Sequence, residues 1–199
     1  VYGLTKGQAS PTLKLAQQTK SQPTPNSNYN VNPIALAISS GFTFVARGYS
    51  YDVRHLKDLI IAAVKHKGLA FLDVLQPCPT YNDINTRDWF SGEDRIDEAT
   101  NKPMPRIYKL EDTEYDPVVH FNDDIELNEK RTQAMVKSLE WDTKIPTGIF
   151  YKNELITPFT RRIIDKIPNY VENPSALQKI SRNGQSITNI DKILDTLEV

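Results

Sequence analysis

The sequence predicts an α/β fold in which helices flank a mostly parallel sheet. FTFVA (42–46) is a compact apolar run of strand length, and LAFLDVL (69–75) is a second one. Residues 53–67 between them read as a helix. A strand, a helix and a strand joined in this way form a βαβ unit, so we expect the two strands to be parallel and buried on both faces.

The segments before this unit read as loops and one short helix. Residues 1–12 are the end of a strand followed by a Gly-containing loop. Residues 20–30 are rich in Pro, Asn and Ser, which is typical of an exposed connection. Asn32 followed by Pro33 predicts a helix start, and Gly41 predicts its end.

The helix between the two strands carries signals at both of its ends. Asp52 can cap it, and Lys65 and Lys67 suit the negative end of the helix dipole before Gly68 ends it. Ligands of open α/β sheets bind beyond the carboxyl ends of parallel strands. Because QPCPTYN (76–82) follows such an end, the single cysteine lies where sites form.

The pattern is looser after residue 82. Residues 83–120 lack sustained periodicity apart from a short strand at 106–110, and a stretch of this kind is usually functional or packed on another chain. The remaining expected elements are an amphipathic helix at 120–141, a last strand at 147–151, a short helix at 157–167 and a helix at the C-terminal end.

The composition is that of a globular protein and excludes several classes. Charged residues make up 25% and apolar residues 39% of the chain, and the net charge of −1 predicts no attraction to nucleic acid or acidic membranes. No apolar stretch is long enough to span a bilayer. We expect neither a signal peptide nor, with one cysteine, an internal disulfide, which favours a cytoplasmic protein.

The opening segment VYGLTKGQASPT (1–12) is the most informative one. Gly3 and Gly7 let the backbone approach a ligand closely, and Thr5 is one of several residues that offer neutral oxygens to a diphosphate or its Mg²⁺. As a Gly-rich loop alone the segment is better read as a plain turn. Since Val1 is not a methionine and lies at a strand-to-loop transition, we expect that upstream residues are missing.

The full string resembles the motif that closes the thiamine diphosphate site in β subunits of archaeal-type 2-oxoacid:ferredoxin oxidoreductases, within the pyruvate:ferredoxin oxidoreductase superfamily. Further likeness covers most of the chain, including residues 32–49 and 145–153. The resemblance implies that the Val1 backbone carbonyl binds Mg²⁺ and that Gly3 and Leu4 lie against the diphosphate. The Mg²⁺-binding Asp of the GDG motif and an Asn are implied upstream of this chain.

Cys78 is the candidate metal ligand. A lone cysteine is most often a small buried apolar residue. Pro77 and Pro79 fix its backbone and remove N–H donors, which suits a rigid thiolate. The CPTYN string resembles the family segment that supplies one cysteine to a [4Fe–4S] cluster, which four thiolates hold. The other three cysteines are implied to lie upstream.

Other polar and aromatic residues carry weaker signals. His55 and His66 are expected at the solvated face or end of the helix at 53–67, and no spacing of histidines indicates a metal site. Trp89 and Phe90 read equally well as a subunit anchor or as a local latch. Lys6 occupies a position that is often Gly in pyruvate-preferring relatives, so we expect it to contact the substrate and to extend specificity toward 2-oxoglutarate.

The resemblance implies an enzyme that oxidatively decarboxylates 2-oxoacids with coenzyme A to acyl-CoA and CO₂, and that passes electrons through the cluster to ferredoxin. Residues 1–165 would be the C-terminal part of the thiamine-diphosphate-binding domain, and residues 166–199 a tail packed on the partner subunit or the domain. The activating glutamate is implied in the α subunit of a heterodimer, so no catalytic residue is expected in this chain. Two alternatives stay open: another thiamine diphosphate enzyme without a cluster, and a non-catalytic α/β binding module.

Overall fold

The computed structural model describes residues 7–187 and 190–197. The chain forms two compact units, Val1–Ile156 and Thr157–Val199. Each unit is described by itself. None of the helices within the described residues is long and apolar enough to cross a membrane.

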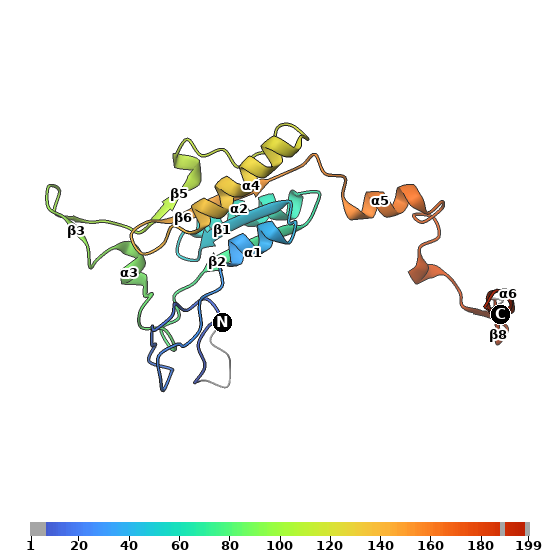
Figure 1. The fold of residues 1–199 in the computed structure, drawn as a ribbon, viewed down its shortest axis with the longest axis horizontal. Helices are drawn as coiled ribbons and strands as arrows, with labels where there is room; N and C mark the ends of the chain where they lie inside the picture. The colour runs from blue at the N-terminus through green and yellow to red at the C-terminus, as the bar shows by residue number, and fades with distance from the viewer. Residues whose placement is uncertain (1–6, 188–189, 198–199) are drawn as a thin grey trace. The chain divides into compact units, whose positions relative to one another are not determined.

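The first unit is built on a four-stranded sheet with the order β2-β1-β6-β5 (Figure 1). The strands are β1 (Phe44–Tyr49), β2 (Ala70–Leu75), β5 (Ile107–Lys109) and β6 (Ile145–Lys152). β1 pairs with β2 and β5 pairs with β6 in parallel, whereas β1 and β6 are antiparallel. The predicted α/β fold and the βαβ unit are therefore confirmed, with a mixed sheet.

One expectation about the βαβ unit is wrong. Every residue of β1 is buried, but β2 lies at the edge of the sheet and is only half-buried, with Val74 exposed. The sequence pattern predicted two strands covered on both faces. An apolar run of strand length does not tell a central strand from an edge strand.

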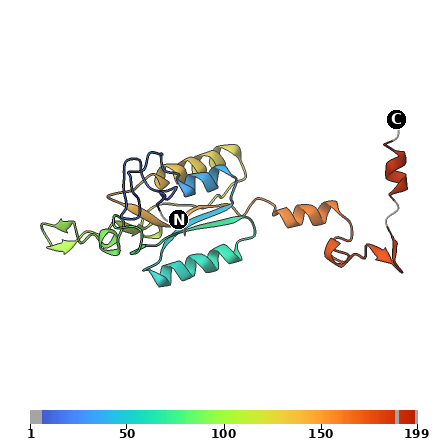
Figure 2. The same cartoon turned by 90° about the horizontal axis from the view of Figure 1, so that it is seen from below.

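Helices cover both faces of the sheet, as Figure 2 shows. On one face α2 (Val53–Lys65) packs through Leu59 against Phe44 and Ala46. On the other face α1 (Pro33–Ser39) and α4 (Asp124–Ser138) pack against Val45, Phe150 and Tyr151. The alternation of Phe44, Val45 and Ala46 between the two cores is the period of two that a strand imposes.

The helix starts follow from the predicted caps. The Asn32 side chain accepts hydrogen bonds from the Ile34 and Ala35 N–H groups at 3.1 and 3.2 Å, with Pro33 at the first helical position. The Asp52 side chain likewise caps α2. α2 ends at Lys65, two residues before the predicted end, because the chain turns extended at His66.

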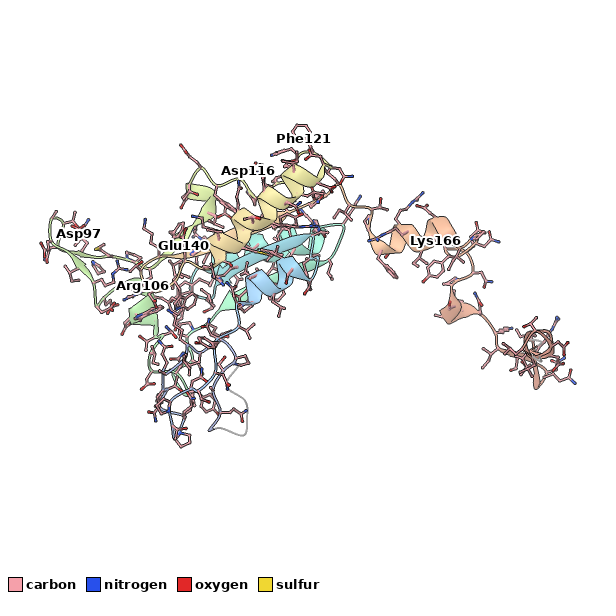
Figure 3. All side chains as sticks on the ribbon, viewed as in Figure 1. Asp97, Arg106, Asp116, Phe121, Glu140 and Lys166 are labelled. Carbon is pink, nitrogen blue, oxygen red and sulfur yellow. The ribbon has the colours of Figure 1, made fainter. Side chains whose placement is uncertain are left out.

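Short elements fill the segment that lacks periodicity. They are α3 (Arg87–Ser91), the hairpin of β3 (Ile96–Asp97) and β4 (Lys102–Pro103), and the 3-10 helix η1 (Leu110–Asp112). Figure 3 shows Asp97 on this projecting hairpin, with Arg106 nearer the sheet. The buried Arg106 side chain donates to both Asp94 carboxylate oxygens at 2.6 and 2.7 Å and to the Asp142 carbonyl at 2.7 Å. These charge-assisted bonds hold the base of the hairpin.

Phe90 of α3 packs inside the first unit. Its ring is buried against Tyr49, with the ring centroids 5.1 Å apart, and both belong to a core cluster with Ile145. Trp89 is half-buried beside the same cluster. The burial of Phe90 supports the local latch for this residue, and the subunit anchor stays a prediction for the half-buried Trp89.

The second unit contains α5 (Phe159–Lys166), η2 (Ser175–Leu177), the short hairpin of β7 (Ser181–Arg182) and β8 (Gln185–Ser186), and α6 (Asp191–Asp195). The helices expected at 157–167 and at the C-terminal end are confirmed. None of the described residues of α5 is buried. The assignment of residues 166–199 to a tail packed on a partner subunit or on the domain stays a prediction.

Candidate functional site

Most of the predicted cofactor residues lie outside the described part of the chain. Val1, Gly3, Leu4, Thr5 and Lys6 all precede Gly7, where the description begins. The structure therefore describes residues 7–12 of the predicted cofactor loop (1–12), the segment that follows it, and the predicted cluster ligand Cys78.

The described part of the predicted cofactor loop, residues 7–12, is tightly folded. Gly7 has a left-handed φ of +73°, and its N–H donates to the Ser21 carbonyl at 3.2 Å. Ser10 is buried, and its hydroxyl lies 2.9 Å from that of Thr12. Glycine suits the left-handed backbone at Gly7 because it has no Cβ.

Hydrogen bonds from the buried Asn26 side chain hold together the segment that follows this loop. Its side chain is 6% exposed, and the amide nitrogen donates to the Leu13, Lys14 and Asn28 carbonyls at 2.8, 3.2 and 2.9 Å. The expectation of an exposed connection at 20–30 is therefore wrong for this residue. Composition alone does not distinguish a solvent-exposed asparagine from a buried one whose side chain donates hydrogen bonds to backbone carbonyl groups.

Cys78 is a half-buried free thiol just beyond the carboxyl end of β2. The Cys78 carbonyl accepts the Tyr81 and Asn82 N–H groups at 3.3 and 2.9 Å, which closes a turn. The Asn82 side chain in turn accepts the Ile84 and Asn85 N–H groups at 2.8 and 3.0 Å. The cysteine therefore lies on a loop held by hydrogen bonds.

The structure brings the segment that follows the predicted cofactor loop into contact with the loop of Cys78. The Lys20 N–H donates to the Asp83 carboxylate at 2.9 Å, and the Lys20 ammonium group donates to the Pro79 carbonyl. Residues separated by 59 and 63 positions along the chain thus meet beside Cys78. Nothing in the spacing of the sequence indicated this contact.

A cavity of about 740 Å³ lies between these segments and the strand ends. It is lined by the loop residues Ser10, Thr12 and Lys14, by Arg47 of β1 and Asp73 of β2, and by Gln76 just before Cys78. Because β1 and β2 are parallel, the cavity sits where α/β sheets bind ligands. It is the candidate functional site.

Arg47 and Asp73 are the charged pair of this cavity, and the sequence reading missed them. They face each other in the β1–β2 register, and the Arg47 Nε donates to the Asp73 carboxylate at 2.8 Å. The guanidinium carbon lies over the Trp141 and Phe150 rings, at 5.7 and 5.5 Å from their centroids. The sequence does hold a signal: Arg47 directly follows the first apolar run, and Asp73, of opposite charge, lies within the second.

A second cavity of about 520 Å³ shares Trp141 with the first. In it the Tyr108 hydroxyl donates to the Glu140 carboxylate at 2.5 Å, and Lys137 pairs with the same carboxylate at 2.6 Å. Burial, followed by the hydrogen bond to Glu140, raises the pKa of Tyr108. Tyr108 is therefore a hydrogen-bond donor rather than a base at neutral pH.

The histidines are less solvated than expected. The His66 ring is fully buried, and its Nε2 lies 2.7 Å from the Thr43 hydroxyl. Burial lowers the pKa of His66. The His55 side chain is also mostly buried, with Nε2 at 3.3 Å from the Glu111 carboxylate. Within the described residues, no group of three or more His, Cys, Asp or Glu side chains is placed to hold a metal ion.

Two models of known protein families match parts of this chain. Residues 1–74 match the C-terminal thiamine pyrophosphate binding domain of thiamine pyrophosphate enzymes, and residues 104–166 match the C-terminal region of the pyruvate ferredoxin oxidoreductase β subunit.

Two curated relatives resemble nearly the whole chain. The β subunit of the 2-oxoacid:ferredoxin oxidoreductase of Sulfolobus sp is 55% identical over 200 residues, which is 100% of this chain and 61% of the relative. That of Saccharolobus solfataricus is 52% identical over 195 residues, which is 98% of this chain and 59% of the relative. The chain thus spans about three fifths of these relatives.

A solved structure supports the fold. It is the 2-oxoglutarate:ferredoxin oxidoreductase from Magnetococcus marinus with 2-oxoglutarate, coenzyme A and succinyl-CoA bound. The similarity has a TM-score of 0.62 at 24% identity and covers 100% of this chain and 55% of that one. At this identity the likeness concerns the fold alone.

Proposed function

The chain belongs to the family of 2-oxoacid:ferredoxin oxidoreductase β subunits, and from this membership we propose that it forms part of an enzyme that oxidises 2-oxoacids with coenzyme A. The products are acyl-CoA, CO₂ and reduced ferredoxin, the carboxylate carbon leaving as CO₂ and two electrons passing to ferredoxin. An α subunit completes the site and supplies the activating glutamate. The complex works in the cytoplasm.

One observation carries this proposal. The segment that continues the predicted cofactor loop and the loop that holds Cys78 meet at the carboxyl ends of β1 and β2, around the 740 Å³ cavity. A diphosphate loop and a cluster cysteine have to be neighbours if electrons are to leave the cofactor for a cluster. A non-catalytic binding module would not require this proximity.

The donor groups in the described part of the predicted cofactor loop suit a magnesium diphosphate. The Ser10 and Thr12 hydroxyls line the cavity and supply neutral oxygens, which are ligands that Mg²⁺ and phosphate accept. In this proposal the Val1 carbonyl binds Mg²⁺, and Gly3, Leu4 and Thr5 hold the diphosphate. Thiamine diphosphate, when bound, supplies the carbanion stabilisation that decarboxylation of a 2-oxoacid requires.

Cys78 fits the role of one ligand of a [4Fe–4S] cluster. Its thiol is half-buried on a loop that hydrogen bonds hold in place, and a rigid thiolate is what cluster ligation needs. The described residues offer no second cysteine, so the other three ligands come from outside this chain. An isolated Cys78 would be inert in a thiamine diphosphate enzyme without a cluster.

The test is reconstitution of the full-length β subunit with its α subunit under anaerobic conditions. We expect ferredoxin reduction that requires a 2-oxoacid, coenzyme A and thiamine diphosphate together. Bound thiamine diphosphate without iron and without ferredoxin reduction would favour another thiamine diphosphate enzyme. A complex that binds no thiamine diphosphate would favour the binding module. Either result refutes the proposal.

A further inference from the structure

Arg47 is a buried cation with unused hydrogen-bonding capacity. The residue is 3% exposed, and its Nη1 is buried without a hydrogen-bond partner among the described residues. Asp73 engages Nε. A buried charged donor that stays unpaired costs free energy, so such a group calls for an acceptor. Arg47 also lines the 740 Å³ cavity.

The surroundings of Arg47 keep the guanidinium in one place. The strand register sets it beside Asp73, and the Trp141 and Phe150 rings lie on it at 5.7 and 5.5 Å. Asp73 engages Nε, and the buried Nη1 has no hydrogen-bond partner among the described residues, so this terminal nitrogen is left for another group. A guanidinium held in this way can donate a charge-assisted hydrogen bond to a carboxylate oxygen.

The charge of the cavity favours a singly charged ligand group. Its lining cations are Lys14 and Arg47, and its lining anions are Asp73 and Asp142. Lys14 is paired with Asp142 at 2.6 Å. Because these lining charges balance, a phosphate bound without Mg²⁺ would bring two charges that nothing compensates, whereas a carboxylate brings one charge, which the unpaired Nη1 of Arg47 can meet.

We propose that Arg47 binds a carboxylate of the 2-oxoacid and thereby orients the substrate in this cavity. The inference rests on the proposed function and adds to it a substrate-binding residue. Asp73 is the positioning residue, because it fixes the rotamer of Arg47 through Nε. The carboxylate is either the one next to the keto carbon, which all 2-oxoacids share, or the distal one of 2-oxoglutarate.

The test uses the α–β complex with Arg47→Met combined with Asp73→Leu. The double change removes both charges together, so neither is left buried alone. Lys130→Met with Asp116→Asn is the matched control, because it breaks an ion pair of 2.6 Å outside the cavity lining. Titration calorimetry with glutarate, which has no keto group to react, measures carboxylate binding without turnover.

We expect the double variant to bind glutarate about 10- to 150-fold more weakly, the range for a charge-assisted hydrogen bond. Thiamine diphosphate content and the unfolding midpoint should match those of the control. A matching rise in KM for pyruvate and 2-oxoglutarate assigns Arg47 to the shared carboxylate, and a rise for 2-oxoglutarate alone assigns it to the distal one.

Unchanged glutarate affinity in the double variant, or no glutarate binding by the wild-type complex, overturns the inference. The proposed function fails separately, through the absence of 2-oxoacid-dependent ferredoxin reduction in the wild-type complex. A wild-type complex that is active, with a double variant that binds glutarate normally, would refute Arg47 alone.

Discussion

Asn26 allows the link between local packing and cofactor binding to be tested. Its amide nitrogen donates to the Leu13, Lys14 and Asn28 carbonyls. Three hydrogen bonds at about 1 kcal/mol each set the cost of Asn26→Ala at about 2–3 kcal/mol. Because this segment continues the predicted cofactor loop, its opening should weaken thiamine diphosphate binding while leaving the iron content unchanged.

Hydrogen exchange measures this cost locally. The Ala16 N–H donates to the Asn26 carbonyl and the Val31 N–H to the Pro11 carbonyl, both at 2.8 Å. A loss of 2–3 kcal/mol should speed exchange of these amides about 30- to 150-fold. Asn28→Ala, the same change at an exposed side chain, is the control. Equal protection in the two variants, or equal thiamine diphosphate affinity, would refute the reasoning.

Three further predictions concern single residues. Cys78→Ala should remove the visible absorbance of the cluster and abolish ferredoxin reduction while thiamine diphosphate still binds; full iron content in this variant would show that Cys78 is no ligand. Lys6→Gly should lower kcat/KM for 2-oxoglutarate at least tenfold more than for pyruvate, within the roughly 10- to 150-fold of a charge-assisted bond, and equal losses would exclude a distal-carboxylate contact. Burial lowers the pKa of His66 in the folded protein. Below pH 6.5, roughly the ordinary pKa of histidine, this side chain is therefore protonated in the unfolded chain but still neutral in the folded one. In that range the free energy of unfolding should fall by up to about 1.4 kcal/mol for each pH unit of acidification. Denaturant unfolding of wild type and His66→Gln at pH 7.5 and 5.5 checks this, and identical pH dependence would contradict it.

The βαβ unit was predictable because its physics is local. Each apolar run has strand length, and Asp52 caps the helix between them in the structure. The edge position of β2 was not predictable, because it depends on which strands pair across the whole sheet. The position of β6, antiparallel to β1 and parallel to β5, likewise follows from contacts between distant segments.

The candidate site was predictable in its place but not in its charged residues. The topology rule placed the site beyond the parallel strands, where Gln76 and the loop of Cys78 lie. The sequence predicts a solvated His66 because this residue ends a helix, but its partner Thr43 is 23 positions away and no spacing reveals the contact. Arg47 and Asp73 could have been found, since a charge inside each of two apolar strands requires an opposite one nearby.

The central claim is that the segments around Cys78 and the predicted cofactor loop form one site for 2-oxoacid oxidation. The most direct test is to add a 2-oxoacid to the anaerobic α–β complex in the absence of ferredoxin and to record its visible absorbance. We predict that the cluster absorbance bleaches with wild type and that no bleaching occurs with Cys78→Ala. A wild-type complex that retains thiamine diphosphate and iron but shows no bleaching with any 2-oxoacid would contradict the claim.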